Sequence, residues 1–314
     1  MHFNSNSFSR HRFHFSHGII LSLAILFLAS CKKETSTTEA NLIFQFKFDS
    51  TQQRLNNIGE VAVMPAGHAG LNPVFNGMSA HYIELAGSAL TLLGQGAVLY
   101  KAAETSTGGD NAIDFSKSTI VKDGETFFSM PLKNINPGTY EWLRVSLAYQ
   151  NYDVRYFVDT SISGFHFTGE FPGTVASFIG FDSYIQSYKI KTKEVVLNAN
   201  RKQGYWGFET TVSAGGFTME DTLTGQAPPG ATTVPNPIFS TSPIPQGSCV
   251  VTGAFVPGKL TITGNETKDI VVQVALSTNK SFEWIDRIAD GKWEPGKGEQ
   301  VVDMGIRGMI PILK

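Results

Sequence analysis

Three of the chain's seven histidines follow residue 30, and His68, His81 and His166 are the first residues that could do chemistry. A neutral imidazole is a ligand of copper or zinc, and a thioether suits reduced copper. We expect His68 in a loop and His81 at the start of a strand, so the two could converge across a turn and form a copper site. The residues that could complete that site are Met64, Met78, Glu104 and His166. The alternative is that local hydrogen bonds satisfy each histidine.

Two tryptophans near the C-terminus are candidates for contact with a ligand. Trp293 lies between Lys292 and Glu294 in a predicted turn, and Trp284 precedes it in the same region. An exposed indole has an apolar face and a polar edge, which suits a sugar or an apolar ligand. We therefore expect Trp293, with Trp284, to form a ligand platform. The alternative is an indole folded over its own hairpin.

Acidic residues also gather near the C-terminus, but their spacing does not fit a calcium loop, which needs acids at alternate positions. They are Glu283, Asp286, Asp290, Glu294, Glu299 and Asp303. Ile288 occupies a position where a ligand would be needed. We expect a solvated, acid-rich hairpin around Asp290 and Gly291.

The chain contains no complete catalytic motif. Residues 291–298 match the glycine and lysine spacing of a phosphate-binding loop, but Gly298 stands where the magnesium-binding serine or threonine belongs. The sequence also lacks the Gly-x-Ser-x-Gly, His-Glu-x-x-His and Cys-x-x-Cys motifs. The carboxylate pair of a glycosidase can come from distant strands, so a glycan-acting enzyme stays an alternative. The sequence predicts no catalytic residue and favours a protein that is not an enzyme.

The N-terminal residues have the order of a secretory signal. Arg10 and Arg12 precede an apolar run over residues 18–30, and Cys31 follows that run. The run is shorter than the roughly 20 apolar residues that a membrane-spanning helix needs. Small residues stand before the cysteine, as in a cleaved signal. We therefore expect a signal peptide over residues 1–30.

The segment Leu28-Ala29-Ser30-Cys31 resembles the lipobox of bacterial lipoproteins. The resemblance implies cleavage before Cys31, acylation of that cysteine with chains such as palmitate, and a lipid anchor in a membrane. Residues 31–40 are mostly polar and predict a flexible tether. The absence of Asp after Cys31 resembles lipoproteins of the Gram-negative outer membrane, and the periplasmic and outer faces both stay open. The alternative is an ordinary signal, with Cys31 an incidental thiol.

Composition narrows the classes of partner. Once Arg10 and Arg12 are removed with the leader, 23 basic residues stand against 27 acidic ones. The chain has no basic stripe, which argues against a nucleic-acid partner. A charged fraction of 17% and 31 glycines are typical of a turn-rich β protein. Cys249 is the only other cysteine, so an acylated chain has no internal disulfide, and we expect Cys249 to be a buried thiol in a strand.

Apolar residues alternate with period two along most of the chain, which predicts strands. In residues 41–49, Leu42, Phe44, Phe46 and Phe48 fall on one face. Asp-Gly and Pro-Gly turn signals separate many such runs, and Asp123-Gly124 predicts a hairpin. We expect an all-β fold, an antiparallel β-sandwich of jelly-roll or Ig-like type, over residues 41–314.

A long proline-rich loop is predicted over residues 225–248, which hold six of the 14 prolines. Proline lacks the N–H that a sheet ladder requires, so this segment is not a central strand. We expect the strands that follow the loop to return to the same sheets.

Two segments of the N-terminal half resemble the MbnP-like β-sandwich lipoproteins of Gram-negative envelopes. They are residues 42–49 and residues 78–85, the second continuing through Tyr100 to Asn136-Pro137-Gly138-Thr139-Tyr140. The resemblance implies a β-sandwich and, in the family's named member, a copper site with histidines and an oxidised tryptophan. Only His81 of the three histidines lies in a matched segment.

Together these patterns predict a protein of the cell envelope, held on the outer membrane by lipid, that binds a ligand or partner. The ligand stays open between a small molecule, a glycan and a protein. The alternatives are copper binding through His68, His81 and His166, and an enzyme that acts on glycans.

Overall fold

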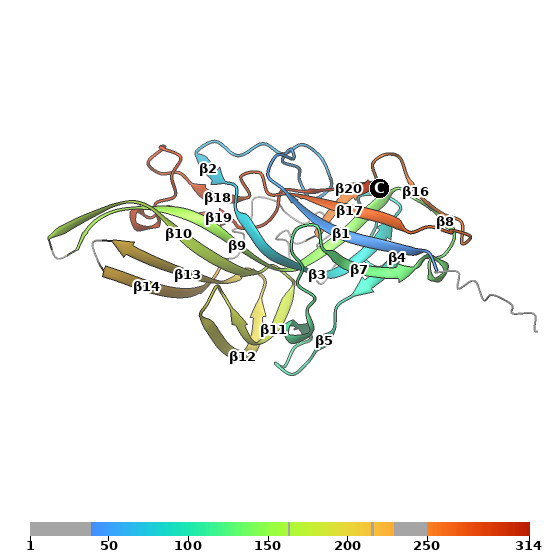
Figure 1. Ribbon diagram of the computed structural model, residues 1–314, viewed down its shortest axis with the longest axis horizontal. Helices are drawn as coiled ribbons and strands as arrows, with labels where there is room; N and C mark the ends of the chain where they lie inside the picture. The colour runs from blue at the N-terminus through green and yellow to red at the C-terminus, as the bar shows by residue number, and fades with distance from the viewer. Residues whose placement is uncertain (1–38, 163, 215–216, 229–249) are drawn as a thin grey trace, which may run out of the picture. The chain divides into compact units, whose positions relative to one another are not determined.

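The computed structural model describes residues 39–162, 164–214, 217–228 and 250–314. The predicted signal peptide, Cys31, the tether up to residue 38, most of the proline-rich loop and Cys249 lie outside these residues. Figure 1 shows that the described chain consists of strands joined by turns and short 3-10 helices. None of the helices in the described ranges is long and apolar enough to cross a bilayer. The predicted all-β fold is confirmed.

A seven-stranded antiparallel sheet forms the centre of the fold, in the order β14-β13-β10-β9-β3-β4, with β15 also paired to β9. Its strands are β3 (Val74–Ala86), β4 (Ala97–Lys101), β9 (Trp142–Ile162), β10 (Phe165–Phe178), β13 (Tyr205–Ala214), β14 (Phe217–Gln226) and β15 (Val250–Ala254). The 21 residues of β9 join the parts of this sheet. β3 pairs with one side of β9 as far as Asp153, and β15 and β10 follow one another along its other side.

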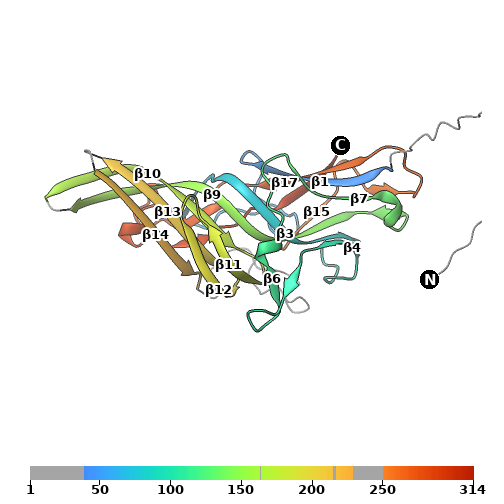
Figure 2. The ribbon, with the colours of Figure 1, turned by 60° about the horizontal axis from the view of Figure 1, so that its bottom comes forward.

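A second sheet, of order β20-β17-β1-β7, packs on one face of the central sheet. Its strands are β1 (Asn41–Asp49), β7 (Thr126–Pro131), β17 (Ile270–Ser277) and β20 (Met309–Leu313), and Figure 2 shows β17, β1 and β7 side by side. Leu42, Phe44 and Phe46 are fully buried, as the alternation predicts. They form the main hydrophobic core with Leu143 and Val145 of β9, so the sheets build a β-sandwich. β1 and β17 are parallel, whereas the other pairs of this sheet are antiparallel.

A β-bulge in β9 decides which side chains face which layer. Ser79 of β3 pairs with Tyr149, whereas Ala80 pairs with Leu147, so Ala148 is an extra residue in β9. The alternation of side chains shifts by one at this point. Leu147 therefore joins the main core, while Tyr149 joins a second cluster on the opposite face.

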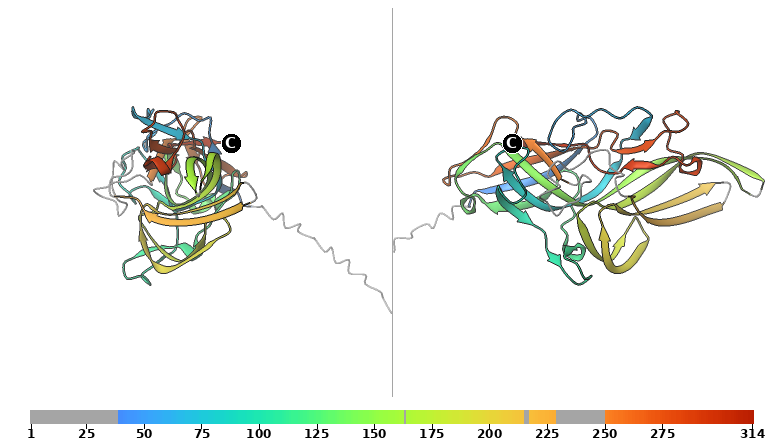
Figure 3. Two further views of the ribbon diagram at one scale, coloured as in Figure 1. Left: turned by 90° about the vertical axis from the view of Figure 1, so that its left-hand side faces the viewer. Right: turned by 180° about the vertical axis from the view of Figure 1, so that it is seen from behind.

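Two further sheets cover the remaining faces, and Figure 3 shows them on opposite sides of β9 and β10. One has the order β12-β11-β6-β5, from β5 (Glu104–Thr105), β6 (Ala112–Asp114), β11 (Asp182–Lys189) and β12 (Glu194–Lys202). The other has the order β19-β18-β2, from β2 (His68–Leu71), β18 (Phe282–Ile285) and β19 (Val301–Asp303). Phe282 and Trp284 of β18 pack with Tyr152 and Val154 of β9. The remaining named elements are β8 (Gly138–Tyr140), β16 (Leu260–Ile262), η1 (Phe115–Lys117), η2 (Leu132–Asn134) and η4 (Pro295–Lys297).

Two local expectations are wrong. The turn at Asp123-Gly124 forms, but it closes no hairpin, because Val121 bridges to Met78 and β7 pairs with β1. The proline-rich loop does not begin at residue 225, because β14 continues to Gln226 and pairs with β13. The first error arises because the partner of Val121 is distant in sequence, and the second because the β13–β14 hairpin extends further than the sequence pattern indicates. Beyond residue 250, β15 pairs with β9 and β17 pairs with β1.

Candidate functional site

The three candidate histidines each contact a different carboxylate. The atom pairs are Nδ1 of His68 with Oε1 of Glu283 at 2.7 Å, Nε2 of His81 with Oε1 of Glu104 at 2.8 Å, and Nε2 of His166 with Oδ1 of Asp159 at 2.7 Å. Within the part of the chain that the structure describes, no three His, Cys, Asp or Glu side chains gather so that they could hold a metal ion. The expected convergence of His68 and His81 is not found. His68 pairs across its sheet with Ile285, whereas His81 packs against Phe181.

The two candidate tryptophans border one groove but differ in exposure. Trp284 is 1% exposed and belongs to the apolar cluster between β18 and β9. Trp293 is half-buried in the loop that follows β18. Both line a groove of about 500 Å³. Trp293 is therefore the less buried of the two, although its ring also packs edge-on against Tyr156 and Phe208.

The groove lies where β9 has an open edge. β3 begins at Val74, opposite Asp153, and no described strand pairs with that side of β9 from Val154 onward. The loop after β18 reaches the same edge further along, where Phe157 donates its backbone N–H to the carbonyl oxygen of Trp293 at 2.7 Å. Residues 153–157 of β9 therefore line the groove between the start of β3 and Trp293.

Glu299 holds the loop that carries Trp293. Its side chain accepts the backbone N–H of Arg287 at 3.0 Å and that of Glu294 at 2.7 Å, and Glu299 is buried. The Trp293 ring packs edge-on against Phe282, with the ring centroids 4.6 Å apart. The expectation of a solvated acidic hairpin is wrong for Glu283, Glu294 and Glu299, which are buried. The carboxylate of Glu299 folds the loop from within.

Cationic side chains frame the groove. Arg155 of β9 and Lys191, in the turn between β11 and β12, are exposed. Neither side chain has a hydrogen bond or an ion pair to another residue in the described ranges. Lys292 differs, because its ammonium lies 4.3 Å from the ring centroid of Phe157 and 3.2 Å from Asp290. Arg155 and Lys191 are thus the groove cations whose donors are not already used.

Two carboxylates line the same groove. Asp153 accepts a hydrogen bond from the hydroxyl of Thr174 at 2.5 Å. Glu170 lies on β10 opposite Phe157, and its side chain has no hydrogen bond or ion pair among the described residues. The groove therefore presents both anionic acceptors and cationic donors beside its aromatic wall.

Sequence reasoning missed Arg155, Phe157 and Lys191 as groove residues. Residues 154–158 read as an ordinary strand, and nothing in their pattern shows that one edge of the strand stays open.

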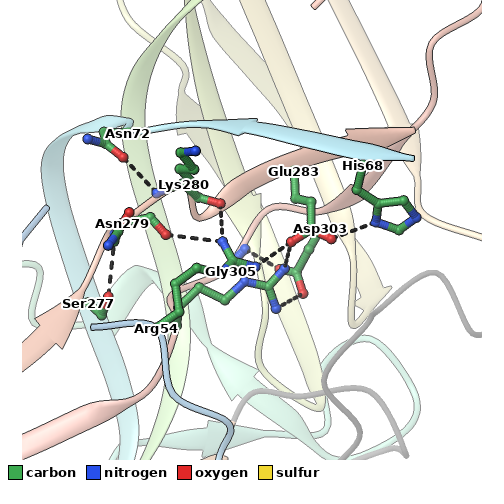
Figure 4. A network of polar contacts seen from close by, with 10 residues as sticks. Arg54, His68, Asn72, Ser277, Asn279, Lys280, Glu283, Asp303 and Gly305 are labelled. Atoms are coloured by element: carbon green, nitrogen blue, oxygen red, sulfur yellow. Dashed lines mark hydrogen bonds and ion pairs between the residues drawn. The ribbon is translucent and has the colours of Figure 1, made fainter. Parts of the chain in front are cut away.

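A buried ion network in β18 lies beside the groove. Figure 4 shows Glu283 with Arg54, His68 and Asp303. Oε2 of Glu283 lies 2.5 Å from Nη2 of Arg54 and also 2.5 Å from Nη2 of Arg307. Burial opposes the charge on Glu283, but Arg307, His68 and Arg54 together hold the pKa of Glu283 below its ordinary value. Glu283 therefore favours its ionised form, and its contacts connect β18 to β2 and to the chain after β19.

The groove can hold an elongated ligand against one edge of β9. Trp293 offers aromatic surface, Arg155 and Lys191 offer donors, and the two carboxylates offer acceptors. Apolar walls with a few polar groups are typical of ligand sites. Comparisons of the chain with protein-family models, with characterised proteins and with solved structures gave no match.

Proposed function

We propose that the protein is a lipid-anchored binding protein of the cell envelope that holds a glycan chain in the groove beside Trp293. The single observation that carries the proposal is that one groove combines aromatic side chains with Arg155, Lys191 and Glu170, whose side chains have no hydrogen bond or ion pair among the described residues. In this proposal the protein binds the chain and does not cleave it.

The chemistry of the groove suits a sugar. A pyranose ring has an apolar face of C–H groups that packs on an aromatic ring, and hydroxyls around its rim that need hydrogen bonds. Trp293 supplies the ring, while Arg155 and Lys191 supply donors and Glu170 supplies an acceptor.

The anchor part of the proposal rests on the leader. The basic residues, the short apolar run and the lipobox-like segment that ends at Cys31 support acylation of that cysteine. β1 begins at Asn41, so ten residues join the lipid to the folded sheets. A fully extended chain of that length spans about 35 Å at most. The anchor would therefore keep the start of β1 within about that distance of the membrane surface.

A glycan array tests the binding. The full chain, produced with its own leader in a Gram-negative host and purified in mild detergent, is applied to neutral and acidic oligosaccharides, and hits are measured by calorimetry. We expect at least one glycan family to bind, and Trp293→Ala to weaken it by about tenfold, equivalent to about 1.4 kcal/mol. Trp142→Ala is the matched control, because Trp142 is also half-buried and does not line the groove.

Two results would contradict the proposal. If the folded parent chain binds no glycan on the array, the proposal that the groove holds a glycan is wrong. Release of shortened sugars from a bound chain would instead favour the glycan-acting enzyme, since Asp153 and Glu170 line the same groove and such enzymes use two carboxylates. Loss of that release in Glu170→Gln would assign the reaction to the groove.

A further inference from the structure

We infer that the groove selects glycans that carry carboxylates, such as chains of uronic acids, through Arg155 and Lys191. The inference rests on the proposed function and names the class of sugar that the groove prefers. Its starting point is that these two cations come from different layers of the fold and meet at one groove.

Lys191 is placed by a rigid turn. The carboxylate of Glu209 accepts the backbone N–H of Lys191 at 2.8 Å and that of Lys193 at 3.0 Å, and it accepts the hydroxyl of Thr192 at 2.6 Å. Glu209 is itself buried on β13. The fold thus holds the backbone of Lys191 at the groove, while its ammonium group has no hydrogen bond or ion pair to any residue that the structure describes.

Arg155 is placed by the open edge of β9. Phe157 turns its backbone N–H toward Trp293, and backbone groups two residues apart point to the same side of a strand. The N–H and C=O of Arg155 therefore point toward the groove. Pro172, opposite Arg155, agrees with this direction because it has no N–H to exchange across the β9–β10 ladder. Arg155 offers a guanidinium and two backbone groups at one position.

A carboxylate is the ligand group that uses these donors best. A guanidinium binds a carboxylate with two parallel hydrogen bonds, and an ammonium adds a second positive charge nearby. Of the groove's two acids, Asp153 already accepts the Thr174 hydroxyl. Glu170 repels a carboxylate at its end of the groove and accepts sugar hydroxyls there. A uronic acid carries both groups on each ring, so its carboxylate can contact Arg155 and Lys191 while its hydroxyls contact Glu170.

The test compares two forms of one sugar. Hexagalacturonate and its methyl ester have the same chain, but the ester lacks the charges. Calorimetry with the full chain at about 0.05 M salt is expected to show the acid binding about tenfold tighter than the ester, and the difference to shrink at about 0.5 M salt. In Arg155→Gln/Lys191→Gln the affinity for the acid is expected to fall to within about threefold of that for the ester.

Two variants separate this inference from the proposed function. Lys122→Gln/Lys268→Gln removes the same charge at exposed sites outside the groove and is expected to leave both affinities unchanged. Trp293→Ala is expected to weaken acid and ester alike. The inference that the groove selects acidic glycans would be overturned if the acid and the ester bound equally well, or if neither of them bound. Equal binding that is lost in Trp293→Ala would leave the glycan groove standing, and the array decides that question independently.

Discussion

The carboxylate of Glu283 and the guanidinium of Arg307 lie 2.5 Å apart, and their side chains are 0% and 1% exposed. Arg54 contacts the same Oε2 atom of Glu283, and Arg307 also lies 2.9 Å from Asp303. Charges in such a place are costly to desolvate, so each depends on the others for its compensation. The pair therefore joins two segments that no strand ladder connects, β18 and the chain after β19.

Glu283→Gln is expected to destabilise the fold by about 3 to 5 kcal/mol, because it removes the buried carboxylate that Arg54 and Arg307 share and leaves Asp303 as the remaining acid beside them. The free energy of unfolding from urea denaturation measures the effect. The loss should exceed that of most single substitutions, which destabilise by about 1 kcal/mol.

Glu141→Gln is the matched control. Glu141 also contacts a cation, Lys259, but both side chains are about half exposed. Exposed pairs contribute about 0 to 1 kcal/mol, so this variant should stay close to the parent. Similar losses in the free energy of unfolding for both variants would show that the network around Glu283 stabilises the fold no more than an exposed ion pair does.

The environment of Glu209 predicts that the stability of the fold depends on pH. Burial of its carboxylate opposes ionisation, but the Thr192 hydroxyl and three backbone N–H groups hold the pKa of Glu209 at about 2. A lowered carboxyl pKa stabilises the fold above the unfolded value near 4.5, and this contribution is lost as pH falls toward 2. At pH 7, Glu209→Gln should therefore cost about 2 to 3 kcal/mol, and the gap to the parent should narrow by about pH 3.

Glu194→Gln controls for a carboxylate on the neighbouring strand. Glu194 is exposed and accepts one hydrogen bond, from the Ser187 hydroxyl at 2.7 Å. Its removal should change the free energy of unfolding by less than about 0.5 kcal/mol at either pH. A constant gap between Glu209→Gln and the parent from pH 7 to pH 3 would contradict the assignment of the low pKa.

The fold class could be predicted from the sequence because it depends on a local signal. The alternation in residues 41–49 marks a strand with one buried face, and a strand with one buried face needs a second layer. Leu42, Phe44 and Phe46 fill that layer. What alternation cannot show is the partner of each strand, which is why the Asp123-Gly124 hairpin was wrongly expected.

The candidate site was only half predictable for the same reason. Trp293 could be found because a tryptophan between charged residues in a turn is unusual. Arg155 and Lys191 could not be found, since their place at the groove depends on where β3 begins and on how Glu209 holds a turn. The bulge at Ala148 is also silent in the sequence, yet it sets the face of every later residue of β9.

The lipid anchor predicts a change of location. Cys31→Ala removes the thiol that the proposal acylates, so palmitate labelling should disappear and the protein should leave the membrane fraction. Cys249→Ala is the matched control and should keep both the label and the membrane location. Labelled Cys31→Ala protein would contradict the anchor, and so would a loss of label in Cys249→Ala.

His81 predicts a second and separate response to pH. Burial lowers the pKa of His81 below its ordinary value of 6.5, against the opposing effect of Glu104. As pH falls through 6.5 the unfolded chain binds a proton that the folded chain does not, so folding loses stability between pH 7 and pH 5. His81→Gln should reduce that loss of stability. In NMR spectra of the parent chain, the imidazole resonances of His81 should titrate below pH 6.5. His166→Gln makes the same substitution at an exposed ring and is the control for the change of residue type. An unchanged slope in His81→Gln would show that the ring of His81 is not the group that responds.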